Sequence, residues 1–304
     1  MTELIGPNDL PAIGPEQNAE FVALSFLVRF PNKATRDGYG RALRQWFTWC
    51  YARALDPLDA KRLHIEAWCR ELELGGNQKT TVATKLHALA GFYKFAFIDG
   101  IIEADPMLHV ARPKLQRQST TNGLRRSEMW ALVQAAERHS PRAHALFSIL
   151  AFNGFRISEA LGVAIEDLDF DRGYTTIFVR RRKSDLQQTV PLSQLTAWAV
   201  QNYKGTRTTG PLFITSTDKR LIRQGAARML DQLVREVGIT KRITLHSFRH
   251  AFCTLSHDAG VSERNIQHSG GWSDLRMVSY YDRGGDKIHN HATHMLTAFV
   301  AGVE

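Results

Sequence analysis

The chain has 304 residues, of which 43% are hydrophobic and 23% are charged, and its formal net charge is +9. This length allows two domains of ordinary size, and the composition is that of a globular protein, which excludes a disordered chain. The excess of positive charge predicts a polyanionic partner whose binding depends on salt.

The first 17 residues are rich in Pro, Gly and Asn and predict a flexible lead. They contain no basic segment followed by an apolar one, so we expect no signal peptide. The longest apolar stretch, residues 145–152, is too short to span a bilayer. Cys50, Cys69 and Cys253 are scattered without metal-ligand spacing. We therefore expect a cytoplasmic protein with reduced thiols and no membrane partner.

Residues 18–110 show helical periodicity without strand-like alternation. Thr35 is a candidate cap for a helix whose apolar stripe is Tyr39, Leu43, Trp46, Phe47 and Cys50. The next stripe is Leu58, Ile65, Trp68 and Leu72, and another helix opens after Gly75-Gly76-Asn77. The pattern predicts a bundle of four or five helices with an aromatic core, closed by Asp105-Pro106.

Residues 111–124 are polar and basic with almost no apolar periodicity, which predicts a linker. From residue 125 to 304 a second domain of mixed composition follows. Ser127 is a candidate cap for its first helix, and a second helix covers residues 141–152.

Two β-rich segments, residues 174–179 and 187–192, flank a basic hairpin tip at residues 180–185. Helices then continue to the end of the chain. The predicted fold is mainly α, with a small antiparallel β-sheet in a mixed α+β second domain.

Six residues of this second domain stand in recognisable local contexts. Arg156 follows a helix-ending Gly and begins an R-x-x-E with Glu159, and His246 and Arg249 form an H-x-x-R at a helix start. The other three are Lys183 in the hairpin tip, Trp272 after Gly271, and Tyr281 nine residues later. Arginines bind phosphate oxygens with two parallel hydrogen bonds, and a tyrosine hydroxyl can form a covalent phosphoester. The set therefore predicts phosphodiester chemistry without a metal.

In these motifs, and over roughly residues 18–300, the chain resembles the tyrosine recombinase (phage integrase) family. The resemblance implies an N-terminal core-binding domain, here residues 18–110, and a catalytic domain, residues 125–304. Trp272 stands where most members carry His, a replacement familiar in Cre-like members. It exchanges a proton carrier for a pure N–H donor. The resemblance implies strand cleavage through a 3′-phosphotyrosine, with no cofactor, no metal and no ATP.

Each of the six residues has an expected role in that chemistry. Tyr281 is the nucleophile, and Arg156 and Arg249 stabilise charge on the phosphate. His246 and Trp272 donate to the phosphate, or His246 accepts the tyrosine proton, and Lys183 protonates the leaving 5′ oxygen. Glu159 is expected to orient Arg156. Two alternatives stay open: Lys183 as a simple phosphate contact, and Tyr280 as the nucleophile.

Double-stranded DNA is the partner that these residues imply. The linker is then either a solvated tether or a strap lying along DNA, and the chemistry favours the strap. The predicted DNA contacts are Lys79, Lys85, Arg112, Lys114, Arg117, Arg181 and Arg182.

The C-terminal region contains a histidine cluster, His289, His291 and His294, for which no completing ligands indicate a metal site. Residues 295–300 predict a short apolar helix, which packs either on its own domain or, as often in the family, on a neighbouring protomer.

We expect a site-specific recombinase that acts as a homo-tetramer on two DNA sites, in integration or excision of a mobile element or in DNA resolution. The alternatives are a type IB topoisomerase and a non-catalytic DNA-binding protein. The two-domain order argues against the first alternative, and retention of all six residues argues against the second.

Overall fold

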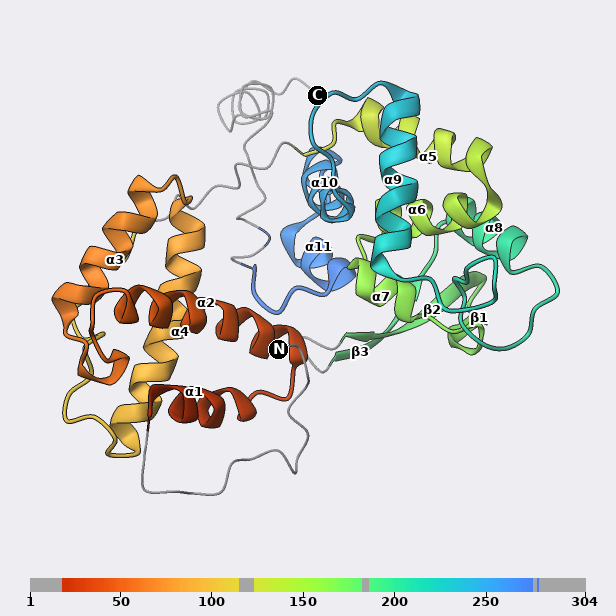
Figure 1. The fold of residues 1–304 in the computed structure, drawn as a ribbon. Coiled ribbons are helices and arrows are strands. Elements are labelled where there is room, and N and C mark those ends of the chain that lie inside the picture. The colour runs from red at the N-terminus through yellow and green to blue at the C-terminus, as the bar shows by residue number, and fades with distance from the viewer. Residues whose placement is uncertain (1–17, 115–122, 182–185, 276–277, 279–304) are drawn as a thin grey trace, which may run out of the picture. The chain divides into compact units, whose positions relative to one another are not determined.

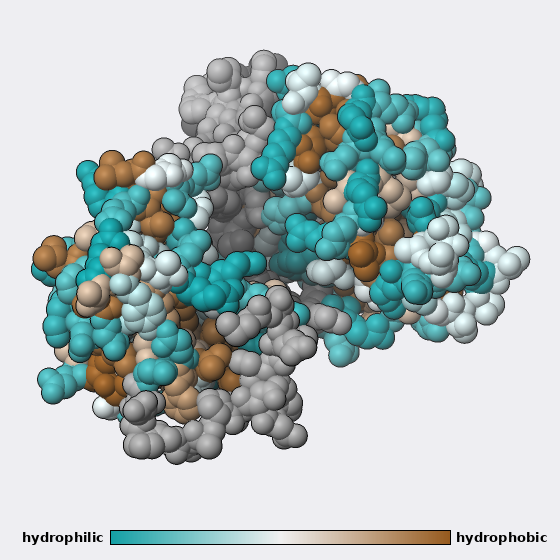
Figure 2. All heavy atoms as spheres, viewed as in Figure 1, coloured by the Kyte–Doolittle hydropathy of each residue, from teal (hydrophilic) through white to brown (hydrophobic). Residues whose placement is uncertain are grey.

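The computed structural model describes residues 18–114, 123–181, 186–275 and 278 (Figure 1). Contacts within the chain divide it into two compact units, residues 1–116 and 117–304. The division falls within the segment that the sequence predicts as a linker, residues 111–124. Figure 2 shows that the visible surface of each unit is mainly hydrophilic, with smaller hydrophobic areas.

The N-terminal unit is a helical bundle, as predicted. Its elements are α1 (Ala19–Val28), α2 (Lys33–Tyr51), the 3₁₀ turn η1 (Pro57–Asp59), α3 (Arg62–Leu74) and α4 (Lys79–Ile98). The apolar stripes expected from the sequence supply its core, because Leu43, Trp46, Ile65 and Leu86 are each at most 2% exposed. A second group of contacts is polar: the indole N–H of Trp46 donates to the Tyr93 hydroxyl at 2.7 Å, and that hydroxyl donates to the Pro57 carbonyl at 2.8 Å. The core aromatics therefore satisfy their polar atoms inside the bundle.

Two expected details of this unit are wrong. The second helix begins at Lys33 and is capped by Asn32, whose side chain accepts from the Ala34 N–H at 2.9 Å. Thr35 lies inside the first turn, because Asn32 already satisfies the exposed backbone donor. Leu58 belongs to the 3₁₀ turn η1 and not to α3, since the chain turns between Asp59 and Arg62.

The second unit combines helices with one small sheet. The helices are α5 (Arg126–His139), α6 (Pro141–Asn153), α7 (Ile157–Gly162), α8 (Gln194–Lys204), α9 (Arg223–Val237), α10 (Leu245–Asp258) and α11 (Glu263–Gly270), with a 3₁₀ turn η2 (Ile165–Asp167). Strands β1 (Leu168–Asp171), β2 (Tyr174–Arg181) and β3 (Leu186–Pro191) form an antiparallel sheet in that order. The expected fold class, mainly α with a small antiparallel sheet, is confirmed.

Strand β2 extends further than the sequence predicts. It continues through Arg181, because Arg180 pairs with Gln187 and Arg181 with Leu186 in the hydrogen-bonded ladder. The first two residues of the expected basic tip are therefore strand residues. Arg180 is also held from the side, since its guanidinium forms an ion pair with buried Asp167 at 2.8 Å.

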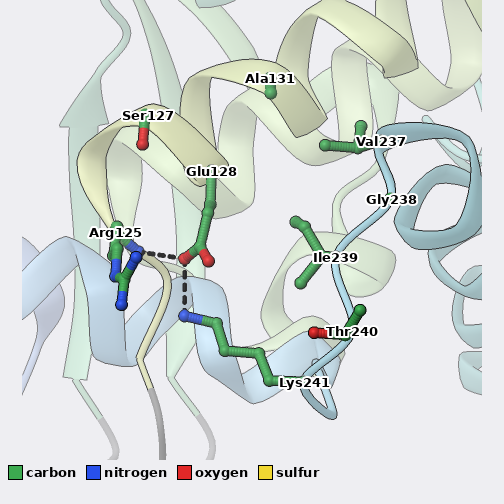
Figure 3. A pocket seen from close by; sticks show the side chains of 9 residues that line it. All are labelled: Arg125, Ser127, Glu128, Ala131, Val237, Gly238, Ile239, Thr240 and Lys241. Carbon is green, nitrogen blue, oxygen red and sulfur yellow. Dashed lines mark hydrogen bonds and ion pairs between the residues drawn. The ribbon is translucent and has the colours of Figure 1, made fainter.

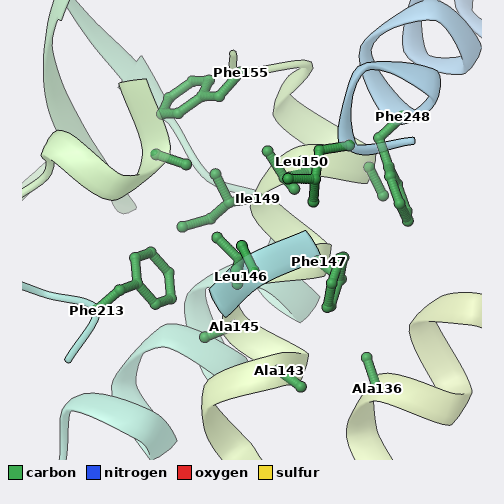
Figure 4. Packing of buried hydrophobic residues seen from close by; sticks show 14 of the residues in the cluster. Ala136, Ala143, Ala145, Leu146, Phe147, Ile149, Leu150, Phe155, Phe213 and Phe248 are labelled. Carbon is green, nitrogen blue, oxygen red and sulfur yellow. The ribbon is translucent and has the colours of Figure 1, made fainter. Parts of the chain in front are cut away.

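Helix α6 forms the centre of this unit. Its residues from Ala143 to Ala151 are all buried, which explains why it is apolar on every side. Figure 4 shows Phe155, Phe213 and Phe248 around this helix, together with Ala136 of α5. Burying one such aromatic or aliphatic side chain stabilises a fold by about 1.5–3 kcal/mol. This core includes residues at the C-terminal end of α6 and at the N-terminal end of α10, next to the predicted catalytic residues Arg156, His246 and Arg249.

Helix α5 begins differently from the expectation. Its cap position is Arg125, and Glu128 closes the turn by accepting from the Arg125 N–H at 2.7 Å. Ser127 therefore lies within the helix and does not cap it. Burial alone would raise the pKa of Glu128, but hydrogen bonds from Lys241 and the Arg125 N–H outweigh it and lower that pKa. Figure 3 shows Glu128 between Arg125 and Lys241, at the wall of a cavity of about 490 Å³.

Candidate active site

Arg156 lies in a tight turn between α6 and α7. Gly154 ends α6 with φ +60°, a left-handed conformation that strains other residues, and an added Cβ would lie 2.4 Å from the Phe252 ring. Glu159 then holds Arg156 twice. Its Oε2 accepts from the Arg156 backbone N–H at 2.8 Å, and its Oε1 accepts from Nη1 at 2.6 Å. The Glu159 side chain is 5% exposed and that of Arg156 is 28% exposed. The guanidinium of Arg156 therefore reaches the surface, while the buried Glu159 carboxylate holds it in place.

Helix α10 begins where the H-x-x-R motif predicts. Thr244 precedes it, and the Thr244 N–H donates to the Ser247 hydroxyl at 3.0 Å. His246 is exposed in the first turn, whereas Arg249, one turn later, is 1% exposed. The two residues therefore differ in accessibility, with His246 at the surface and Arg249 inside the domain.

Arg249 joins two distant turns. Its Nη1 donates to the carbonyl of Gly154 at 2.6 Å and to the carbonyl of Gly270 at 2.7 Å. Gly154 lies two residues before Arg156, and Gly270 lies two residues before Trp272. A single guanidinium thus brings together the backbone segments of three predicted catalytic residues.

Trp272 follows the left-handed cap Gly271 at the end of α11 and is 4% exposed. The Arg249 guanidinium lies 4.0 Å from the centroid of its ring, within cation–π range, and Phe252 stacks on it at 6.4 Å. Gly270 leaves room for this ring, because a Cβ there would lie 1.7 Å from Trp272 Cζ3. Val278 is buried in the same cluster, with Cys253 and Ile266.

Two side-chain hydrogen bonds connect the β2–β3 hairpin to the chain just before the Arg156 turn and just before the Trp272 turn. Asn153 Nδ2 donates to the Pro191 carbonyl at 2.9 Å, and Gln188 Nε2 donates to the His268 carbonyl at 3.2 Å. Sequence reasoning singled out neither residue. The available signal was a polar Asn at the end of an otherwise apolar helix, directly before the Gly154 turn.

Several predicted residues lie outside the described part of the chain. These are Lys183, Tyr281 and its competitor Tyr280, the DNA contacts Arg117 and Arg182, the cluster His289, His291 and His294, and the terminal residues 295–300. Arg181 belongs to β2, but its side chain is not described. Their expected roles stay predictions.

The remaining predicted DNA contacts lie on the N-terminal unit. Lys79, Arg112 and Lys114 are exposed. Lys85 is half-buried, and its ammonium donates to Asn77 Oδ1 at 3.3 Å. Exposed cations are free to contact phosphate. Lys85 has to give up its hydrogen bond to Asn77 before its ammonium can bind a phosphate.

A buried histidine, His250, follows Arg249 in the sequence. His250 is 2% exposed, and its Nδ1 lies 3.3 Å from the Thr254 hydroxyl. Among the residues that the structure describes, no group of three or more His, Cys, Asp or Glu side chains could hold a metal ion. Within the same ranges, none of the helices is both long and apolar enough to cross a bilayer.

Comparison with known proteins places this geometry in a family. The phage integrase family matches residues 122–287, more than half of the chain, and the phage integrase N-terminal SAM-like domain matches residues 27–100. A tyrosine recombinase XerC from Syntrophus aciditrophicus is 30% identical over 69% of this chain and 75% of its own length. One from Pelotomaculum thermopropionicum is 28% identical over 75% of this chain and 78% of its own.

The fold also resembles that of a lambda integrase tetramer bound to a Holliday junction. The TM-score is 0.67 at 16% identity, over 84% of this chain and 76% of that one. The two matched ranges lie in both units, and residues 122–287 span the positions of Arg156, Lys183, the H-x-x-R motif, Trp272 and Tyr281. The chain therefore belongs to the phage integrase family and is a tyrosine recombinase, an enzyme that cleaves and rejoins DNA strands.

Proposed function

We propose that this recombinase exchanges strands between two duplex DNA sites as a homo-tetramer, with Tyr281 as the nucleophile. The observation that carries the assignment is the pair of hydrogen bonds from Arg249 to the Gly154 and Gly270 carbonyls. They tie the Arg156 turn, the H-x-x-R helix and the Trp272 turn into one constellation. Such convergence is what phosphate chemistry by fixed cations requires.

The reaction begins with attack by the Tyr281 hydroxyl on the scissile phosphorus. A tyrosine has a reference pKa near 10, so only about one in a thousand is ionised at neutral pH. Positive charge from Arg156 and Arg249 stabilises both the phenolate and the phosphorane that it forms. In this mechanism His246, which is exposed, accepts the phenolic proton or donates to the phosphate.

Cleavage is complete when the bond between phosphorus and the 5′ oxygen breaks. The bond from the tyrosine oxygen to phosphorus forms in the same exchange, and Lys183 gives the leaving 5′ oxygen its proton. The product is a 3′-phosphotyrosine and a free 5′ hydroxyl. Because the phosphoester is conserved, a second 5′ hydroxyl can attack it and restore the DNA without ATP.

The tetramer is part of the proposal, because exchange of both strands at two sites needs four nucleophiles. The similar lambda integrase was captured as a tetramer on a Holliday junction, which supports this stoichiometry. Docking of residues 295–300 into a neighbouring protomer would link the four active sites. We propose that the reaction takes place in the cytoplasm and serves integration or excision of a mobile element, or DNA resolution.

A suicide substrate tests the nucleophile. It carries a nick next to the cleavage position, so that the cleaved fragment is lost and the covalent complex accumulates. Tyr281→Phe should abolish the covalent adduct on a denaturing gel and leave duplex binding intact, because it removes only the reacting oxygen. Tyr280→Phe is the matched control and should keep the adduct. The assignment is wrong if the adduct persists in Tyr281→Phe or is lost only in Tyr280→Phe.

A strand-transfer assay tests the reaction class. Wild-type protein should join strands from two duplexes that carry the same site. Relaxation of one supercoiled circle without exchange would indicate a topoisomerase, and binding without either reaction would indicate a non-catalytic DNA-binding protein.

A further inference from the structure

Residues 238–244 connect α9 to α10, and this connection is held in place at Lys241. The ammonium of Lys241 forms an ion pair with Glu128 at 2.6 Å and donates to the carbonyl of Gly123 at 2.7 Å (Figure 3). The two charged side chains are only 22% and 20% exposed, so solvent screens the pair in part. Lys241 is therefore occupied by partners within its own unit.

The end of the connection is held by the core and by the start of α10. Ile243 and Leu245 are 7% and 5% exposed and belong to the hydrophobic core of the second unit. The Thr244 N–H donates to the Ser247 hydroxyl at 3.0 Å, within the first turn of the helix. The backbone on both sides of Arg242 is thus fixed by contacts that Arg242 itself does not make.

Arg242 lies on the solvent side of this connection. Exposure alternates along it, with Arg242, Thr244 and His246 exposed and Ile243 and Leu245 buried between them. Because the two buried residues belong to the core, the residues that alternate with them face away from it. Among the described residues, the guanidinium of Arg242 makes no ion pair and no hydrogen bond. Its charge is available to a partner outside the chain.

The short separation in sequence limits the distance between Arg242 and His246. A fully extended chain spans at most ~3.6 Å per residue, so the Cα atoms of these two residues lie within about 14 Å of each other. One strand of B-DNA carries a phosphate about every 3.4 Å along the helix axis. Several phosphates on either side of a scissile phosphate therefore lie within the same distance of it.

We propose that Arg242 binds a phosphate that flanks the scissile phosphate on the cleaved strand. The proposal rests on the proposed function, which puts the scissile phosphate against Arg156, His246 and Arg249. Arginine suits this contact, because its planar guanidinium donates two parallel hydrogen bonds to phosphate oxygens. Since the contact is to the backbone, it strengthens binding and fixes the position of the strand without reading its bases.

The salt dependence of duplex binding tests whether Arg242 neutralises a phosphate. The probe is the duplex of the suicide substrate without its nick, and the protein is the full chain. Arg242→Gln should weaken binding about tenfold and reduce the slope of log K against log salt by about 1. Arg242→Lys keeps the charge and should retain the slope, but it should lose part of the affinity because an ammonium cannot donate two parallel bonds.

Arg172→Gln is the matched control. Arg172 is 90% exposed in the turn between β1 and β2, and the Asp171 carboxylate lies 3.9 Å from its guanidinium. Because this charge already has a neighbour of opposite sign, the variant should bind with the affinity and the salt slope of wild type. Arg242→Gln should also keep the wild-type melting temperature, since no internal partner is lost, so its weaker binding would not reflect unfolding.

Neutral phosphate analogues locate the contact on the DNA. A methylphosphonate removes the charge of a single phosphate, and it is placed in turn at about four positions on either side of the scissile phosphate, the span that the ~14 Å limit allows. At one of these positions wild type should lose about tenfold in affinity, and Arg242→Gln should lose nothing further, because its contact is already absent. At the other positions the effects of the analogue and of the substitution should add.

The results separate two failures. If wild-type protein forms no covalent adduct with the suicide substrate, the proposed function is wrong, and that measurement does not involve Arg242. If wild type forms the adduct but Arg242→Gln binds like wild type, or its loss adds to that of the methylphosphonate at every position, the phosphate contact of Arg242 alone is overturned.

Discussion

At the scale of single residues, Arg249 makes the hydrogen bonds that connect the two turns of the proposed site. Burial of a guanidinium costs free energy unless the charge finds partners. Here the partners are two backbone carbonyls and the face of Trp272. In the proposed mechanism these contacts hold the guanidinium in place before DNA binds.

At the same scale, Glu159→Gln tests whether Arg156 needs its carboxylate. The change removes the charge that pairs with Arg156 Nη1 but keeps one acceptor oxygen for the turn. We expect a loss of up to about 3 kcal/mol in stability, typical of a hydrogen bond to a charged group. Cleavage should fall by less than the ~100- to 1000-fold expected for loss of an arginine itself. Thermal melts and suicide-substrate rates measure the two effects.

The matched control is Glu236→Gln. Glu236 pairs with Arg138 at 2.9 Å, but both side chains are more than 40% exposed, so the pair should contribute at most about 1 kcal/mol. Its cleavage rate should equal that of wild type. An unchanged rate in Glu159→Gln as well would remove Glu159 from the supporting residues.

At the scale of elements, the site is built where helices end. Helix α6 ends at Gly154 and α11 ends before Gly271, both in the left-handed conformation. In each turn a backbone carbonyl, that of Gly154 or that of Gly270, accepts a hydrogen bond from Arg249. Two residues later the chain reaches a predicted catalytic residue, Arg156 or Trp272. Aromatic rings lie too close for a Cβ at two glycines of these turns, Phe252 at Gly154 and Trp272 at Gly270.

Gly270→Ala is the element-scale prediction. The added Cβ would lie 1.7 Å from Trp272 Cζ3, so the indole or the Gly270 carbonyl must move. We expect a stability loss of about 1–3 kcal/mol from overpacking. Displacement of the Arg249 acceptor should lower the cleavage rate by on the order of 100-fold, as measured on the suicide substrate.

Gly162→Ala provides the control, because Gly162 also ends a helix, α7, and a Cβ there meets nothing within 4 Å. This variant should gain up to about 1 kcal/mol in stability and cleave normally. Equal behaviour of the two variants would contradict the steric argument for Gly270.

At the scale of the whole molecule, the chain joins a helical unit with exposed cations to a mixed unit that contains the arginine constellation. The net charge of the whole chain, +9, favours binding to the DNA backbone. In the proposed mechanism, Arg156 and Arg249 of the second unit take the role that a divalent ion has in other phosphoryl-transfer sites. The arrangement leads to a prediction about metals.

Cleavage of the suicide substrate should proceed at the wild-type rate in excess EDTA, because Arg156 and Arg249 supply the positive charge. A magnesium-dependent restriction enzyme acting on the same DNA confirms that the chelator is effective. Recombinase activity that disappears with EDTA and returns with magnesium would exclude the proposed mechanism.

Periodicity in the sequence predicted the helical elements because apolar residues at steps of three and four must share one buried face. It located α2, α4 and α6 closely, and strands β2 and β3 of the sheet, but it missed β1. The H-x-x-R motif marked the start of α10. Capping was predicted less well. Thr35 and Ser127 were reasonable caps by residue type, but Asn32 and Glu128 satisfy the exposed N–H groups. Several residues near a helix start can compete for the same backbone donor, and local sequence does not decide between them.

The sequence by itself determined the chemistry, because only arginine, lysine, histidine, tryptophan and tyrosine in this order carry the donors and the nucleophile that the reaction needs. Only the tertiary structure decided how the described ones among them, Arg156, Arg249 and Trp272, come together. Arg249 reaches carbonyls that are 95 and 21 residues away, and Asn153 reaches one that is 38 residues away. Such bonds depend on how α6, α10, α11 and β3 pack, which no local pattern records. A hydrogen bond to a backbone carbonyl also leaves no trace in the identity of the accepting residue, since every residue carries one.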